Sequence, residues 1–311
     1  MKLHHRAKRR VVIRLLLLTA LLGGCSGLMV FRACPKWVPA DFTLEITELP
    51  ENPFIDPEGM TQETRILPPE GYERTPAAND SFLAFMRRQP LYKNGASKCS
   101  YRGSSIGRGN AAAVYTLSVG RDSYQQCADS IIRLWSEYFF TTGQTERIAF
   151  SLTNGYKTDY ESWRSGKRIL AFGNVAWSMK LAGYDDSVQQ FHNYLMAVMH
   201  YAGTRSLEAE SKPVSVQDAR AGDILVNGGS PGHAVVIVDE AINEAGERCF
   251  LLAQGYMPAQ SCHILTGEED AKNPWYTEEQ LSGDSIPVSS YLFTGEALRR
   301  WKEGFPNPAE E

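Results

Sequence analysis

The most constraining stretch of the sequence is a run of four apolar residues, 235–238, that contains no polar position. A strand with one face in water alternates apolar and polar residues, so a strand that is apolar throughout is expected to be buried on both faces. Glycine- and asparagine-containing turns separate this strand, predicted over residues 233–239, from flanking strands over residues 223–227 and 249–255. The stretch therefore predicts an antiparallel sheet with a buried middle strand.

Two amphipathic helices are predicted before these strands. The first carries an apolar stripe at spacings of three and four, formed by Ala128, Ile131, Ile132, Trp135, Tyr138 and Phe139. The second spans residues 187–201 and ends at Gly203. Helices that precede a small antiparallel sheet are typical of α+β domains, so we predict helices packed on such a sheet.

The first 24 residues have the pattern of an export signal. Residues 1–14 hold six basic side chains, residues 15–22 are apolar, and two glycines precede Cys25. An apolar stretch this short cannot cross a hydrocarbon core that needs about 20 helical residues, so it predicts a cleaved signal peptide. A cysteine directly after small residues resembles the lipid acceptor of bacterial lipoproteins. The alternative is an ordinary signal peptide cut nearby, in which Cys25 has no role.

The lipid on Cys25 would be the membrane anchor. We therefore expect the protein on the cell membrane or the outer membrane, facing the periplasm or the exterior. Residues 25–65 are rich in proline and polar side chains and are predicted to form a tether. Residues 66–302 should form a single globular domain, and residues 303–311 a flexible tail.

The charge of the chain argues against nucleic acid as a partner. The formal net charge of the whole chain is −4, and six positive charges lie in the predicted signal peptide, so residues 25–311 carry −10. An acidic body repels a phosphate backbone. Peptidoglycan or an envelope protein is the partner that the predicted location suggests.

Export also implies an oxidising compartment, in which cysteines can pair. Five cysteines follow the predicted lipid site: Cys34, Cys99, Cys127, Cys249 and Cys262. Because the number is odd, at least one thiol stays free or pairs outside the chain. Cys249 and Cys262 lie around one predicted strand and are a candidate disulfide. Cys99 and Cys127 are the other natural pair.

The residues best suited to chemistry are Cys127, His233 and Gln254. Cys127 stands at the predicted start of the first helix, where unpaired N–H groups and the helix dipole favour the nucleophilic thiolate. His233 opens the buried strand after a glycine-rich turn. If the turn near residues 243–246 is a two-residue hairpin, Gln254 shares a sheet face with His233, opposite it or one step along the diagonal. An amide placed there can fix the imidazole tautomer or donate to an oxyanion.

Each of these residues also has a plainer interpretation. Cysteine is among the most buried residue types, so Cys127 could be a structural thiol, and a histidine at a strand end can simply bond to backbone. The histidines of the mature chain show no i, i+4 pair, and no two cysteines have the CxxC spacing. We therefore expect neither a metal nor another cofactor.

Residues 221–226 (AGDILV) and 232–236 (GHAVV) resemble the core of NlpC-type, papain-like cell-wall cysteine peptidases. In that family a histidine opens the second strand and a polar residue on the next strand completes the triad, and His233 and Gln254 match these positions. The family's cysteine usually lies on the helix just before the Gly-Asp strand, where residues 191–194 contain none. The resemblance thus implies a papain-like core with helices inserted between nucleophile and base, or a relative that has lost catalysis.

A longer resemblance is to a bacterial domain of unknown function, number 4846. Four motifs carry it, QQCAD at residues 125–129, YAGT at 201–204, GGSPGH at 228–233 and AQGYMPAQ at 253–260. The resemblance implies an exported or lipid-anchored setting and gives no established activity.

Two functional hypotheses follow. In the first, the protein is a membrane-tethered thiol hydrolase for peptide or amide bonds of the cell envelope, with Cys127 as nucleophile, His233 as general base and Gln254 orienting the imidazole. In the second, a non-catalytic lipoprotein uses the same cleft to bind cell-wall fragments or a protein partner. The missing cysteine at the usual helix and the alternative Cys99–Cys127 bridge favour the second hypothesis.

Overall fold

The computed structural model describes residues 29–30 and 44–302 of the chain. The predicted signal peptide, Cys25 and the predicted tail lie outside these residues. Within the described part, no helix is long and apolar enough to span a bilayer.

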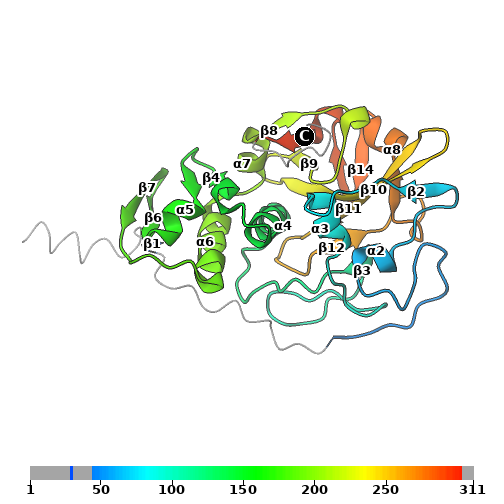
Figure 1. Ribbon diagram of the computed structural model, residues 1–311, viewed down its shortest axis with the longest axis horizontal. Helices are drawn as coiled ribbons and strands as arrows, with labels where there is room; N and C mark the ends of the chain where they lie inside the picture. Colours follow the sequence, from blue (N-terminus) through cyan, green and yellow to red (C-terminus); the bar gives the residue numbers. More distant parts are fainter. Residues whose placement is uncertain (1–28, 31–43, 303–311) are drawn as a thin grey trace, which may run out of the picture.

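The central feature is a nine-stranded antiparallel sheet (Figure 1). Seven strands follow the order β3-β12-β11-β10-β9-β16-β8, while β2 pairs with β10 and β13 pairs with β11. The strands are β2 Tyr72–Arg74, β3 Ala111–Val114, β8 Ser211–Pro213, β9 Ile224–Asn227, β10 His233–Asn243, β11 Arg248–Gln254, β12 His263–Leu265, β13 Trp275–Thr277 and β16 Leu298–Trp301.

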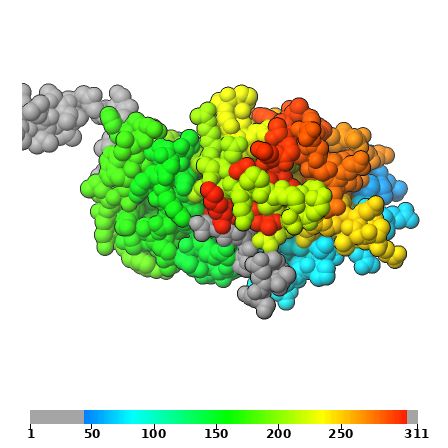
Figure 2. All heavy atoms as spheres, turned by 90° about the horizontal axis from the view of Figure 1, so that it is seen from above, coloured from blue at the N-terminus to red at the C-terminus, as the bar shows by residue number. Residues whose placement is uncertain are grey.

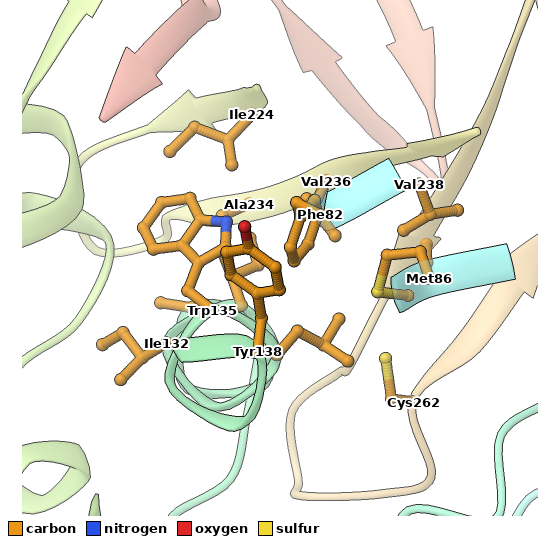
Figure 3. Packing of buried hydrophobic residues seen from close by; sticks show 14 of the residues in the cluster. Phe82, Met86, Ile132, Trp135, Tyr138, Ile224, Ala234, Val236, Val238 and Cys262 are labelled. Carbon is orange, nitrogen blue, oxygen red and sulfur yellow. The ribbon is translucent and has the colours of Figure 1, made fainter. Parts of the chain in front are cut away.

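Helices cover one face of this sheet. Helix α4 Cys127–Thr141 lies across β10 and β11, and α3 Phe82–Arg87 lies beside it on β10. The apolar stripe predicted from the sequence points at the sheet, and Figure 3 shows Ile132, Trp135 and Tyr138 beneath alternate residues of β10. Those β10 residues are Ala234, Val236 and Val238. Burial of this stripe is the main force that fixes α4 on the sheet.

The opposite face is covered by short elements from the last part of the chain. Val235 and Ile237 point to this side and join a second buried cluster. The covering elements are α8 Glu278–Ser282 and a hairpin of β14 Ile286–Val288 and β15 Tyr291–Phe293. The middle strand is therefore buried on both faces, as its unbroken apolar run predicts.

A smaller sheet of order β1-β6-β7 lies at one end of the long axis (Figure 1). Its strands are β1 Met29–Val30, β6 Lys167–Phe172 and β7 Val175–Lys180. The other elements are α2 Gln62–Arg65, β4 Ala149–Ser151, β5 Lys157–Asp159, α5 Tyr160–Arg164, α6 Val188–Tyr201, α7 Thr204–Ala209 and the 3₁₀ turns η1 Thr145–Arg147, η2 Val216–Asp218 and η3 Gly295–Ala297. Helix α6 contacts both α4 and α5, and it thereby joins this end to the main sheet.

The predicted fold class, helices on a small papain-like sheet, was wrong. More described residues lie in strands than in helices, and the sheet has nine strands. The two long helices and the strands β9, β10 and β11 were predicted correctly. Many of the strands that were missed, among them β2, β8, β12 and β13, have three residues each. Strands this short do not show a period of two over enough positions to be distinguished from loops. The six-residue strands β6 and β7 were missed as well.

The predicted tether also requires correction, since residues 44–65 belong to the folded domain. Gln62 is fully buried, donates from Nε2 to the Val238 carbonyl (2.9 Å) and accepts from the Tyr115 hydroxyl (2.5 Å). Composition suggested a solvated segment because its polar side chains look like tether residues in sequence. In the fold, the Gln62 side chain instead bonds to the sheet.

Candidate functional site

Cys127 lines a cavity of about 580 Å³ at the amino-terminal end of α4, which we call the α4 cleft. Its walls come from the first turn of α4, the end of α6, residues 203–205 and the turn at residues 229–232. The cleft therefore brings together residues of all four motifs that distinguish the sequence, since Met257 of the fourth motif also lines it. It is large enough for a few residues of a peptide or a small ligand.

The cysteine side chain is 8% exposed at the edge of this cleft. Burial raises the pKa of the Cys127 thiol, and Asp129 raises it further at pH values where its own carboxyl group is ionised. Backbone N–H groups of Ala234, Ala128 and Cys127 itself face the sulfur and lower the pKa in part. The resting group is thus a thiol, in a site whose N–H groups favour negative charge.

His233 and Gln254 lie side by side, as the sequence predicted. The imidazole Nε2 and the amide Oε1 are 2.6 Å apart, and both side chains are buried. In the sheet, Val236 pairs with Ala253, so Gln254 lies one step along the diagonal from His233. Gly255 follows directly, and a Cβ there would stand 2.1 Å from Ser130 Oγ in α4. A glycine is needed for this strand end to approach the first turn of the helix so closely.

A second histidine, which the sequence did not identify, fixes the orientation of the Gln254 amide. His263 Nδ1 lies 3.0 Å from the Ser261 carbonyl, and its Nε2 lies 3.3 Å from Gln254 Nε2. A carbonyl can only accept, so His263 Nδ1 carries the proton and Nε2 accepts from the amide N–H. Gln254 Nε2 also donates to Ser289 Oγ at 2.6 Å.

The same network assigns the tautomer of His233. Because the amide nitrogen of Gln254 faces His263, its oxygen faces His233 and accepts from Nε2–H. His233 Nδ1 is then the unprotonated nitrogen, available as a base. We refer to the chain Ser261 carbonyl, His263, Gln254 and His233 as the amide relay. His263 lies on β12, which follows β11 after a loop of eight residues, 255–262. The register between these two strands could therefore not be predicted from the sequence.

Two tyrosines enclose the imidazole of His233. The ring of Tyr291 is stacked on it, with centroids 4.1 Å apart and planes at 12°, and Tyr256 meets it edge-on at 5.4 Å. Burial lowers the pKa of His233 to about 4, although the hydrogen bond with Gln254 opposes this shift. Burial lowers the pKa of His263 to about 3, helped by the positive charge of Lys98. Both rings are neutral at pH 7.

The sulfur and the imidazole are neighbours without a direct bond. In the described part of the chain, no hydrogen bond joins Cys127 Sγ to the His233 ring. The sulfur instead faces the N–H of Ala234, the residue after His233. Catalytic contacts are often long in a free enzyme and tighten when substrate binds. The structure thus gathers the three predicted residues at one end of the sheet, and proton transfer from the sulfur to Nδ1 would require these two atoms to approach each other.

Asp129 is a further titratable group in the α4 cleft. One carboxylate oxygen, Oδ2, accepts the N–H of Gln126 at 3.1 Å and caps the helix. The other oxygen is buried and has no hydrogen-bond partner among the described residues. Burial raises the pKa of Asp129 to about 8, so the side chain is largely protonated at neutral pH.

The two suggested disulfides are not formed. Cys99, Cys127, Cys249 and Cys262 are all buried free thiols. Gln254 pairs with His263, which places Cys262 level with Gly255 in this hairpin. Cys249 is six residues from Gly255 along β11, a distance of roughly 20 Å at the rise of a strand, and too far for a bridge.

Nothing in residues 29–30 and 44–302 forms a cluster of three or more His, Cys, Asp or Glu side chains that could hold a metal ion. The groups near Cys127 are suited to proton transfer and hydrogen bonding. The site is best described as a thiol, a base and an amide beside an open cavity.

No curated protein and no solved structure matches this chain. The sequence model of one family, described as a domain of unknown function (4846), matches residues 62–300 and so includes the α4 cleft and the amide relay. The resemblance to NlpC-type peptidases stays a prediction. Since the match covers most of the chain, the protein belongs to the family named domain of unknown function (4846).

Proposed function

We propose that the protein is a thiol hydrolase that cleaves peptide or amide bonds of the cell envelope. One observation carries this proposal. The amide relay leaves Nδ1 of His233 unprotonated, and the next residue in the chain, Ala234, directs its backbone N–H at Cys127 Sγ. A buried thiol at a helix start needs such a base, because its own pKa is too high for the thiolate to form alone.

The reaction would proceed by two acyl transfers. His233 Nδ1 takes the thiol proton while the sulfur of Cys127 attacks the carbonyl carbon, and the negative oxygen is received by N–H groups of the first α4 turn. The imidazolium then gives its proton to the leaving amine, and a thioester remains on Cys127. Water, deprotonated by His233, attacks the thioester, which releases the acid and restores the thiol. Gln254 Oε1 accepts from Nε2–H throughout and stabilises the imidazolium.

The proposed setting follows from the predicted signal peptide. Lipid on Cys25 would hold the domain at the cell membrane or outer membrane, on the side that faces periplasm or exterior. A tethered enzyme stays close to an insoluble substrate such as peptidoglycan. This location gives the proposed activity its substrate class.

The test is thiol reactivity combined with turnover. With iodoacetamide on the unreduced mature protein, we expect Cys127 to be modified faster than Cys99, Cys249 and Cys262, because those thiols do not line the cleft. Modification should quicken as pH rises, since burial holds the pKa of Cys127 above its usual range. Purified peptidoglycan should release new amino groups with the native chain and none with Cys127→Ala. Hydrolysis that persists in Cys127→Ala would contradict the proposal.

The missing sulfur–imidazole bond favours a second candidate, a non-catalytic protein that binds wall fragments in the α4 cleft. Both groups are neutral at rest, so the cleft could serve as a polar binding site alone. This candidate predicts that Cys127→Ser leaves the binding of peptidoglycan fragments unchanged while no fragment is ever cleaved. The same peptidoglycan assay therefore separates the two functions.

A further inference from the structure

Large exposed apolar side chains are concentrated in one short segment. Among residues 44–302, twelve large hydrophobic side chains are exposed, and half of them fall within residues 172–188. They are Phe172, Val175, Met179, Leu181, Tyr184 and Val188, which together we call the apolar lobe. Soluble proteins rarely leave apolar groups clustered in this way unless the surface binds something.

The tip of the lobe is the β6–β7 hairpin, whose turn is Gly173-Asn174. Phe172 and Val175 are direct cross-strand partners at this tip, 62% and 64% exposed. Met179 follows Val175 by four residues along β7, so its side chain emerges on the same face. The hairpin lies at one end of the long axis of the molecule (Figures 1 and 2, green), and it therefore presents these apolar side chains at that end.

The short strand β1 fixes where this tip lies relative to Cys25. Met29 pairs with Ala171 and Val30 with Leu170, in antiparallel order. The chain therefore enters β1 from the side of the hairpin tip. Cys25 precedes Met29 by four residues, which span at most about 14 Å when fully extended. A lipid on Cys25 would hold the tip within that distance of the membrane surface.

We propose that the apolar lobe is a membrane-contacting surface whose hairpin tip, Phe172 and Val175, inserts into the interfacial region of the bilayer. This inference rests on the proposed lipid anchor, since the anchor supplies the proximity. The occupant is a lipid bilayer because the proposed lipid on Cys25 would place the bilayer surface within the reach of four residues from Met29. Burial of the two tip side chains removes apolar surface from water and orients the domain with the β1–β6–β7 sheet toward the membrane.

The test uses the mature chain, residues 25–311, without lipid on Cys25, and vesicles of equal parts phosphatidylethanolamine and phosphatidylglycerol. We expect weak flotation of the native chain with the vesicles. The double variant Phe172→Ser, Val175→Ser should lower the vesicle-bound fraction at least about tenfold. The matched control is Leu292→Ser, which removes an equally exposed apolar side chain from the β14–β15 hairpin and should leave flotation unchanged.

A second readout reports depth. Trp177 lies on the same face of the hairpin as Val175, so bromine-labelled lipids should quench part of the tryptophan fluorescence, and Trp177→Phe should remove that part. Equal flotation of the tip variant and the native chain would overturn the proposal. So would a tip variant that loses self-association in sedimentation while vesicle binding is unchanged. The anchor is tested separately, by lipid labelling of the full-length protein in cells. Because the flotation test uses the chain without lipid, a failure to label Cys25 would contradict the anchor without changing what flotation shows about the tip.

Discussion

Two regions of the molecule use their side chains in opposite ways. In the amide relay beside the α4 cleft, polar groups are buried and each donor has a specific partner, from the Ser261 carbonyl to the imidazole of His233. At the apolar lobe, side chains such as Phe172 are exposed to water. The first region is costly because it buries polar groups, and the second because it exposes apolar ones.

This difference indicates two kinds of function. A buried network in which every donor has an acceptor allows one arrangement, and such rigidity suits a site that must position a proton. An exposed apolar hairpin gains nothing from rigidity and lowers its free energy only when another surface covers it. The predictions below test whether the cleft depends on precise bonding and the lobe on exposure.

The largest effect is expected at the base. His233→Ala should lower the rate of peptidoglycan hydrolysis by about 10²–10⁴-fold, because the thiol loses the group that accepts its proton. The matched control is His200→Ala, since His200 lines the α4 cleft with Cys127 but takes no part in the amide relay. Release of amino groups from peptidoglycan measures both. If the His200 variant loses hydrolytic activity while the His233 variant keeps it, then His233 is not the base.

The buried core beneath the sheet and the apolar lobe should also differ sharply in their contribution to stability. Trp135 is fully buried and stacks on Trp301 with centroids 5.0 Å apart, so Trp135→Ala should reduce the free energy of unfolding by about 3–5 kcal/mol. Phe172→Ala should change it by no more than about 0.5 kcal/mol, because the ring is already in water. Urea unfolding followed by circular dichroism measures both. A large loss for Phe172→Ala would mean that the hairpin tip is part of the core.

The His233–Gln254 pair could be predicted from the sequence, although one step of the reasoning was wrong. The pairing Ile242 with Arg248 leaves a wider turn than the two-residue hairpin assumed, and the numbers of the paired residues sum to an even value near it. A bulge between Ile237 and Asp239 shifts the register by one, so beyond it Val236 pairs with Ala253 and the sum is odd. His233 and Gln254 therefore share a sheet face only because of this bulge, and no residue in the sequence indicates that a bulge occurs there.

Other parts of the site were beyond the sequence. The position of His263 depends on the register across a long loop, and that register is set by tertiary contacts with β3. The apolar stripe of α4 could be predicted because it repeats a helical period over twelve residues, and the β10 strand because its run 235–238 is apolar at every position. The exposure of the apolar lobe could not be predicted in this way, since it depends on whether another element covers the strand.

Asp129 provides a test of the cost of burying polar groups at the α4 cleft. Its pKa is about 8 in the fold and near 4 when unfolded, so between these values ionisation favours the unfolded chain, and stability falls as pH rises. Asp129→Asn keeps an acceptor for the Gln126 N–H and removes this cost. We expect little change at pH 4 and a gain of up to about 4 kcal/mol at pH 7 in urea unfolding. Asp284→Asn, at an exposed site, should be neutral at both values. A loss of stability at pH 7 in the Asp129→Asn variant would mean that the native carboxyl is ionised and paired.

The smallest expected effect distinguishes positioning from chemistry. His263→Leu removes the acceptor of the Gln254 amide, so the amide can flip and the Nε2–H tautomer of His233 is no longer enforced. We expect kcat for peptidoglycan hydrolysis to fall about tenfold with little change in KM, since His263 does not line the cleft. Nitrogen NMR of the His233 ring should change from one tautomer to a mixture. His263→Gln restores an acceptor and should recover both the single tautomer and the rate. If His263→Leu lowers the rate while the His233 ring keeps its tautomer, the amide relay is structural and does not position the base.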